Sequence, residues 1–201
     1  MTELNIAKTD EIGPYTYRDY KKLPEGSRVE LHNGYFYNMA DANEFHFDIQ
    51  GSVFEQFRVY LKDKSCKVYS ERSVRLWYTE DESDKKTYRP DISVVCDKTK
   101  IHNHFIAGAP DLIIEIWSPS TGSVDLVEKR HAYESGGVKE YWVIDSIRRV
   151  YQYLLDELGI YRETVHPSFK GEDIEIPVKI WDGRFSIKLG TFVHQIGDIN
   201  P

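Results

Sequence analysis

The sequence is poor in cysteine and has no long hydrophobic run. Among 201 residues it contains two cysteines, Cys66 and Cys96, neither with a second cysteine nearby. Isolated cysteines of this kind favour reduced thiols in a reducing compartment over a disulfide or a zinc site. No apolar run approaches the ~20 residues that span a bilayer, and residues 1–5 lack the basic flank and apolar stretch of a signal peptide. We therefore expect a cytoplasmic protein that does not contact a membrane.

A surplus of basic residues is also missing. The chain has 26 Lys and Arg against 33 Asp and Glu, a net charge of −7. This balance argues against a sequence-reading nucleic-acid binder, which is usually basic. It does not exclude a nuclease, because carboxylates that hold a cation must themselves be negative. The length is sufficient for a buried core without disulfides, and we expect residues 1–201 to form a single domain.

The N-terminal third predicts a hairpin between two helices. A Thr cap opens a short helix over 16–23, and Asn33-Gly34 separates two strand-like runs. Asn-Gly is a strong hairpin signal because both turn positions require positive φ. Apolar residues recur every four positions over 44–61, which predicts the first long helix, with His46 near its first turn.

The rest of the chain predicts a mixed sheet. The nearly continuous apolar run 111–117 is typical of a central strand, and a helix over 123–135 joins it to another buried strand, 139–145. This order favours a parallel pair with a right-handed crossover. Strands joined by loops alone are expected to be antiparallel. The other expected elements are strands over 67–78 and 89–95, an exposed acidic loop over 79–87 that includes Asp84, an irregular segment over 97–109, a hairpin over 149–164 and a short strand over 185–189.

Two acids stand inside or beside these apolar strands. Asp91 precedes Ile92, and Glu115 lies in the middle of the run 111–117. An isolated buried carboxylate costs several kcal/mol unless a partner compensates it. The partner is a cation, a cluster of backbone N–H groups or a metal ion. If the two strands pair, both acids can bind one Mg²⁺ or Mn²⁺, ions that prefer oxygen ligands. Asp111, after Pro110, has the features of a strand-entry residue rather than a ligand.

Lys129 is the candidate ammonium group for this site. It borders the apolar stripe of its helix and could extend over the sheet toward Glu115. A structural alternative is an ion pair with Asp125 on the same helix, and a salt bridge is likewise the alternative to the metal site. The loop histidines, His102 and His104, show no third ligand for a transition metal nearby.

Several segments together resemble a known family. The matching strings are 89–95 (RPDISVV), 109–121 (APDLIIEIWSPST), Asp125, Lys129, Tyr133 and 137–145 (GVKEYWVID). They resemble the Uma-type restriction endonuclease family of the PD-(D/E)XK nuclease superfamily, formerly a domain of unknown function. The resemblance covers about residues 14–155, which leaves 156–201 as a C-terminal β extension.

The resemblance implies a restriction-endonuclease-like core, an α/β fold in which helices flank a mixed sheet, with extra hairpins at both ends. It also implies Mg²⁺-dependent cleavage of DNA, with Asp91 and Glu115 as metal ligands. Trp117 stands where the motif has its Lys, and Lys129 is expected to take over that catalytic role. Glu30 and His46 match recurrent family positions and are expected to be accessory residues. For these two, a surface acid and a helix cap are the structural alternatives.

Three functions remain open from the sequence. The first is a divalent-metal-dependent DNA endonuclease, which acts as a homodimer if it cuts both strands with one site per chain. The second is a catalytically inactive protein on the same fold that binds nucleic acid or a protein; Trp117 and the net charge of −7 leave this alternative open. The third is a phosphoester hydrolase that acts on a small substrate. A net negative charge opposes the binding of such a substrate less than it opposes the binding of DNA.

Overall fold

The fold is a six-stranded mixed sheet between two long helices. The computed structural model describes residues 13–39, 41–117 and 123–190, without the side chains of 123–126. The sheet order is β10-β9-β8-β7-β5-β3. Its strands are β3 (Lys67–Ser70), β5 (Ile92–Val95), β7 (Leu112–Ile116), β8 (Glu140–Ile144), β9 (Val150–Leu155) and β10 (Tyr161–His166). None of the described helices is long and apolar enough to cross a bilayer.

The central strands pair as the sequence predicts. β7 and β8 are buried along their whole length and run parallel, and helix α3 (Ser123–Gly136) connects them. β5 is antiparallel to β7, and β3 is antiparallel to β5. The predicted α/β fold with a mixed sheet is therefore confirmed.

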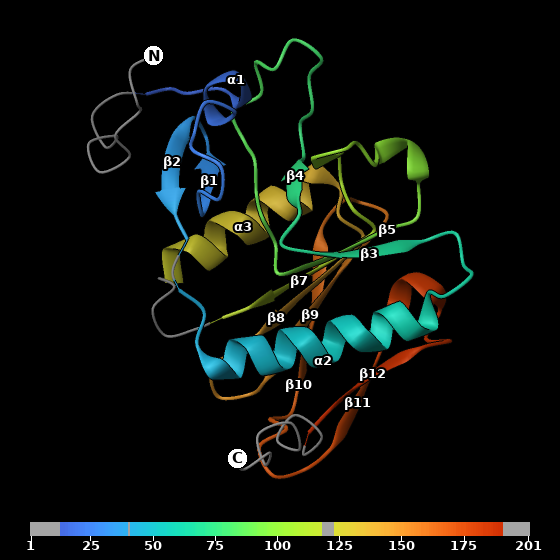
Figure 1. Cartoon of the computed structure of the whole chain (residues 1–201). Helices are drawn as coiled ribbons and strands as arrows, with labels where there is room; N and C mark the ends of the chain where they lie inside the picture. Colours follow the sequence, from blue (N-terminus) through green and yellow to red (C-terminus); the bar gives the residue numbers. More distant parts are fainter. Residues whose placement is uncertain (1–12, 40, 118–122, 191–201) are drawn as a thin grey trace.

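Each face of the sheet packs against one long helix (Figure 1). Helix α2 (Glu44–Tyr60) packs Val53 and Phe57 into the same core cluster as Ile114 of β7. On the other face, Tyr133 of α3 shares a cluster with Ile113 of β7. Because side chains alternate along a strand, neighbouring residues of β7 contribute to different layers. The face that carries Ile113 is also the face of Glu115.

Small two-stranded sheets lie at both ends of the chain. Helix α1 (Tyr17–Tyr20) precedes the hairpin of β1 (Val29–His32) and β2 (Tyr35–Asn38). Its turn residues Asn33 and Gly34 have φ of 51° and 90°, as the Asn-Gly signal predicts. Near the C-terminus, β11 (Ile174–Pro177) and β12 (Ser186–Leu189) form a second antiparallel pair.

The strand predicted over 67–78 is wrong, because the chain leaves the sheet after β3. Glu71 has φ of 47°, a left-handed conformation that ends the extended run. The continuation, β4 (Ser73–Arg75), pairs in parallel with β6 (Phe105–Ala107), which lies in the segment expected to be irregular. Short helices η2 (Lys98–Lys100) and η3 (Lys179–Trp181) complete the described elements.

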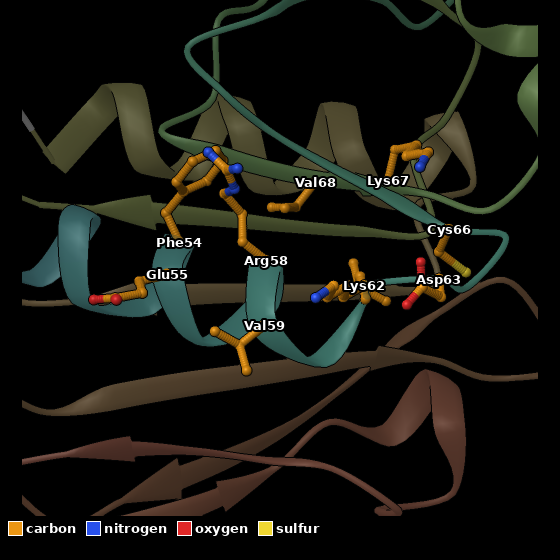
Figure 2. Close-up of a pocket in the computed structure, with 10 residues that line it drawn as sticks. Phe54, Glu55, Arg58, Val59, Lys62, Asp63, Cys66, Lys67 and Val68 are labelled. Carbon is orange, nitrogen blue, oxygen red and sulfur yellow. The ribbon is translucent and has the colours of Figure 1, made fainter.

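The expectation of two reduced thiols is also wrong, since a disulfide joins Cys66 and Cys96. The register pairs Lys67 with Val95, so the two cysteines lie opposite each other at the end of the β3–β5 ladder, with Cα atoms 3.8 Å apart. Thirty residues separate them in the sequence, and only the strand pairing brings them together. Figure 2 shows Cys66 at the edge of a surface pocket of about 880 Å³ between α2 and β3.

We expect this disulfide to contribute measurably to stability. A Cys66→Ser, Cys96→Ser double variant should lose about 3–4 kcal/mol of unfolding free energy, because the unfolded chain no longer carries a closed loop. Urea denaturation measures the loss, and a dithiol reductant should lower the wild-type protein to the stability of the variant. Rapid alkylation of both cysteines in the native protein without reductant would contradict the assignment.

Candidate active site

The paired strands β5 and β7 bring Asp91 and Glu115 together. The register aligns Ile92 with Ile114, and one step further along the ladder sets Asp91 opposite Glu115. Directly opposed residues of an antiparallel pair share a face of the sheet. Asp91 Oδ2 also accepts a hydrogen bond of 2.6 Å from the backbone N–H of Ile116. Both acids are buried, with 6% and 7% of their surface exposed.

Lys129 reaches these acids from helix α3. Its Nζ lies 3.2 Å from Oε1 of Glu115 and 3.1 Å from Oε2 of Glu30. The side chain is buried, as expected for a cation between two carboxylates. The alternative partner Asp125 has a side chain outside the described residues. Lys129 therefore joins an acid of the sheet to an acid of the N-terminal hairpin.

Glu30 and His32 form the hairpin side of the site. Glu30 is 4% exposed, so the alternative of a surface acid is wrong. Its Oε2 lies 2.8 Å from Nε2 of His32, and its Oε1 accepts a hydrogen bond from the backbone N–H of Arg89 at 2.7 Å. His32 was not among the predicted site residues, although the alternation of side chains along β1 places it on the same hairpin face as Glu30.

His46 lies on the other side of Asp91, in the first turn of α2. Its Nε2 is 3.0 Å from Oδ1 of Asp91. The helix cap is Asn43, whose side chain accepts a hydrogen bond from the backbone N–H of His46, so the alternative of a capping role for His46 is wrong. One turn further, Gln50 donates to the backbone carbonyl of Asp91 at 3.1 Å. α2 thus holds Asp91 through two side chains.

Tyr133 completes the surroundings of Glu115. Its hydroxyl donates a hydrogen bond of 2.7 Å to Oε1 of Glu115, and the ring is fully buried. In the sequence, Tyr133 is one of the residues that match the family, but it was not predicted as a site residue. Its position four residues after Lys129 puts both side chains on one helix face. That spacing was the available signal for a second polar partner.

The carboxylates of the site have pKa values that diverge. Burial raises the pKa of Glu115 to about 8; the Lys129 charge opposes this effect, and the charges of Asp91 and Glu30 add to it. Burial also raises the pKa of Glu30, but Lys129 and His32 outweigh it and lower the value to about 2. Burial lowers the pKa of His46, yet the Asp91 carboxylate outweighs burial and raises it. Such divergence is common at functional sites.

The donor set suits a hard divalent cation with a largely aqueous shell. The described residues contain no group of three or more His, Cys, Asp or Glu side chains suited to a metal. Asp91 and Glu115 would therefore supply two carboxylates, and water or carbonyl oxygen the remaining ligands, as is usual for Mg²⁺. Burial, with repulsion from Asp91 and Glu30, raises the pKa of Glu115, and a cation at this position would favour the ionised carboxylate.

Asp111 and the loop histidines lie outside this network. Asp111 stands at the other end of β7, where its carboxylate contacts Lys139 Nζ at 2.7 Å and accepts the backbone N–H of Cys96 at 2.7 Å. The ring of His102 stacks on Phe105, with centroids 4.7 Å apart. Asp111 is thus a strand-entry residue, as the sequence indicates.

The comparison with protein families identifies the chain. The Uma2 family, described as "Putative restriction endonuclease", matches residues 17–179. The chain belongs to the Uma2 family. The match extends beyond the expected limit at 155 and includes β10 and β11. Among curated proteins, none matches this Uma2 chain.

A solved structure shows the same fold. The crystal structure of "a putative nuclease belonging to DUF820" from Anabaena variabilis is similar with a TM-score of 0.68 at 21% sequence identity. The similarity covers 86% of this Uma2 chain and 94% of that chain. At this identity the likeness establishes the fold alone.

Proposed function

We propose that this Uma2 protein is a divalent-metal-dependent endonuclease that hydrolyses phosphodiester bonds of DNA. One observation carries the proposal: the β5–β7 register opposes Asp91 and Glu115, and the Lys129 ammonium contacts Glu115 at 3.2 Å. Neither acid is paired with an arginine in the described residues, which would have favoured a purely structural role. In this proposal Asp91 and Glu115 hold Mg²⁺ or Mn²⁺.

Each side chain has a distinct task in this proposal. When bound, the ion supplies charge neutralisation at a phosphate oxygen and lowers the pKa of a water. Lys129 stabilises negative charge that develops on the phosphate. Tyr133 fixes the orientation of Glu115, and His46 fixes that of Asp91, as the contacts at 2.7 and 3.0 Å indicate. Glu30 holds the Lys129 ammonium at 3.1 Å.

The departure from the superfamily motif at Trp117 agrees with this assignment. Trp117 follows β7, and its backbone N–H donates to the carbonyl of Ile144. The motif Lys is replaced there, but the Lys129 amine reaches Glu115 from α3 instead. The site therefore retains a cation beside Glu115, as the proposed endonuclease requires.

The direct test is cleavage of supercoiled plasmid and, in parallel, of circular single-stranded DNA. We expect nicking in the presence of Mg²⁺ or Mn²⁺ that a chelator abolishes, and a loss of 100-fold or more, about the effect of one electrostatic group, in Asp91→Asn and Glu115→Gln. The matched control is Glu157→Gln, an exposed acid in the turn before β10, which should cleave at the wild-type rate. Equal cleavage of both substrates by wild type and site variants would contradict the proposal.

Calorimetric titration with Mn²⁺ separates an active site from an inactive one. Wild-type protein should bind the ion, and Glu115→Gln should bind it at least ten times more weakly, a loss of about 1.4 kcal/mol. An inactive binding module predicts no binding, or binding that the substitution leaves unchanged. Sedimentation in the same buffer tests the proposed homodimer, which would be needed if the protein cuts both strands with one site per chain.

A further inference from the structure

Exposed aromatic side chains flank the carboxylate network on two sides. Phe47 follows His46 in the first turn of α2 and is 57% exposed, and its ring lies edge-on to the His46 imidazole at 6.1 Å. Tyr37 of β2 is 48% exposed and stacks on the His32 imidazole at 4.7 Å. Each exposed ring offers a π-face on which an unpaired base can stack.

Both rings connect to the site through short contacts. From Tyr37 the path runs through His32 and Glu30 to Lys129, with contacts of 2.8 and 3.1 Å. From Phe47 it runs through His46 to Asp91 at 3.0 Å. The segment 39–43 joins β2 to α2, so the end of β2 and the start of α2 lie within ~21 Å of each other. A chain of a few nucleotides is long enough to span this distance.

The charge near these rings is negative. Glu44 is exposed and Asp48 half-buried in the same helical turn as Phe47. Glu128 lies 3.7 Å from His32, and the whole chain has a net charge of −7. Duplex DNA carries more phosphate charge per unit length than a single strand, so a negative surface opposes the binding of a duplex more strongly. The exposed rings around this site offer π-faces, which are useful only where bases are unstacked.

We propose that the substrate is single-stranded DNA, whose bases stack on Phe47 and Tyr37 while a phosphate lies at Glu115 and Lys129. The inference rests on the proposed nuclease function and narrows its substrate class. Stacking is tolerant of sequence because every base has a π-face. The site therefore prefers unpaired over paired strands and shows little base preference.

Binding is tested without cleavage, with a chelator present. Fluorescence anisotropy compares a labelled single-stranded 20-mer with its duplex. We expect tighter binding of the single strand, and a 5- to 100-fold loss of affinity in Phe47→Leu and in Tyr37→Leu, the range of base–aromatic stacking. Phe47→Trp should retain affinity, because it keeps an aromatic face. Val59→Ala, which removes an exposed apolar side chain later in α2, should have no effect.

A spectroscopic readout distinguishes stacking from a change in folding. A strand that contains 2-aminopurine should lose fluorescence on binding to wild type, and Phe47→Leu should restore most of that fluorescence at saturating protein. Tighter binding of the duplex, or unchanged affinity in both Leu variants, overturns the inference. Either outcome is compatible with metal-dependent cleavage of plasmid, so the proposed nuclease function would stand. If that function is wrong, the protein cleaves no nucleic acid, whether single-stranded or duplex.

Discussion

A Lys129→Met variant should cleave DNA about 100- to 1000-fold more slowly than wild type, the usual effect of removing one preorganised charge from a reaction centre. The substitution removes the ammonium that lies 3.2 Å from Glu115 and 3.1 Å from Glu30. Two buried acids then remain near each other, and the pKa of Glu115, already about 8, rises further. Rates with Mn²⁺ on plasmid and on single-stranded substrate measure the effect.

Lys139→Met is the matched control for this substitution. Lys139 makes an ion pair of 2.7 Å with Asp111 at the other end of β7, and its side chain is 67% exposed. Its loss removes an ion pair from the same strand without touching the site, so cleavage should stay at the wild-type rate. Thermal denaturation of both variants separates lost chemistry from lost structure. A folded Lys129→Met protein with wild-type activity would contradict the assigned role.

The largest effect on stability is expected at the buried pair of Arg75 and Asp84. The two side chains are 2% and 0% exposed and make two hydrogen bonds to each other, one of them 2.9 Å from Nε to Oδ2. The Arg75 guanidinium also lies 3.8 Å from the ring centroid of Tyr17. Asp84→Asn leaves the buried guanidinium without its counter-charge, which should cost about 3–5 kcal/mol.

Urea denaturation measures this loss against an exposed pair. Lys22 contacts Asp19 at 2.8 Å, but its side chain is 60% exposed, and Lys22→Met should cost less than about 1 kcal/mol. An Arg75→Met, Asp84→Leu double variant should recover part of the loss, because neither charge remains unpaired. A cost at Asp84 no larger than that at Lys22 would show that Asp84 is solvated.

The elements around the site follow from local sequence, with one exception. The apolar run of β7, the four-residue spacing in α2 and the Asn33-Gly34 turn each predict the structure found. These signals act over a few neighbouring residues, through φ preferences and side-chain alternation. The break at Glu71 was missed because the residue with the positive φ is a Glu, and not the Gly or Asn that usually indicates such a conformation.

The burial of an acid in an apolar strand does not by itself identify a residue of the site. Glu140 of β8 is also fully buried, yet it lies outside the network around Asp91. Its carboxylate accepts hydrogen bonds of 2.7 Å from Trp142 and Gln152 and one of 2.8 Å from the backbone of Ile180. Enough donors surround this acid without any cation. An acid in an apolar strand therefore becomes a site candidate only when its partners are known.

Local signals thus defined the long helices, the hairpin and the central strands. The acids in apolar strands and the stripe of the crossover helix pointed to Asp91, Glu115 and Lys129, and the family resemblance added Glu30 and His46. The tertiary structure decided which groups meet: the disulfide, the Arg75–Asp84 pair and the contacts of His32 and Tyr133. Arg89 donates to Glu30 across 59 positions of the chain. Such pairings depend on strand register and on helix placement over the sheet, which are properties of the whole packed core rather than of any short segment.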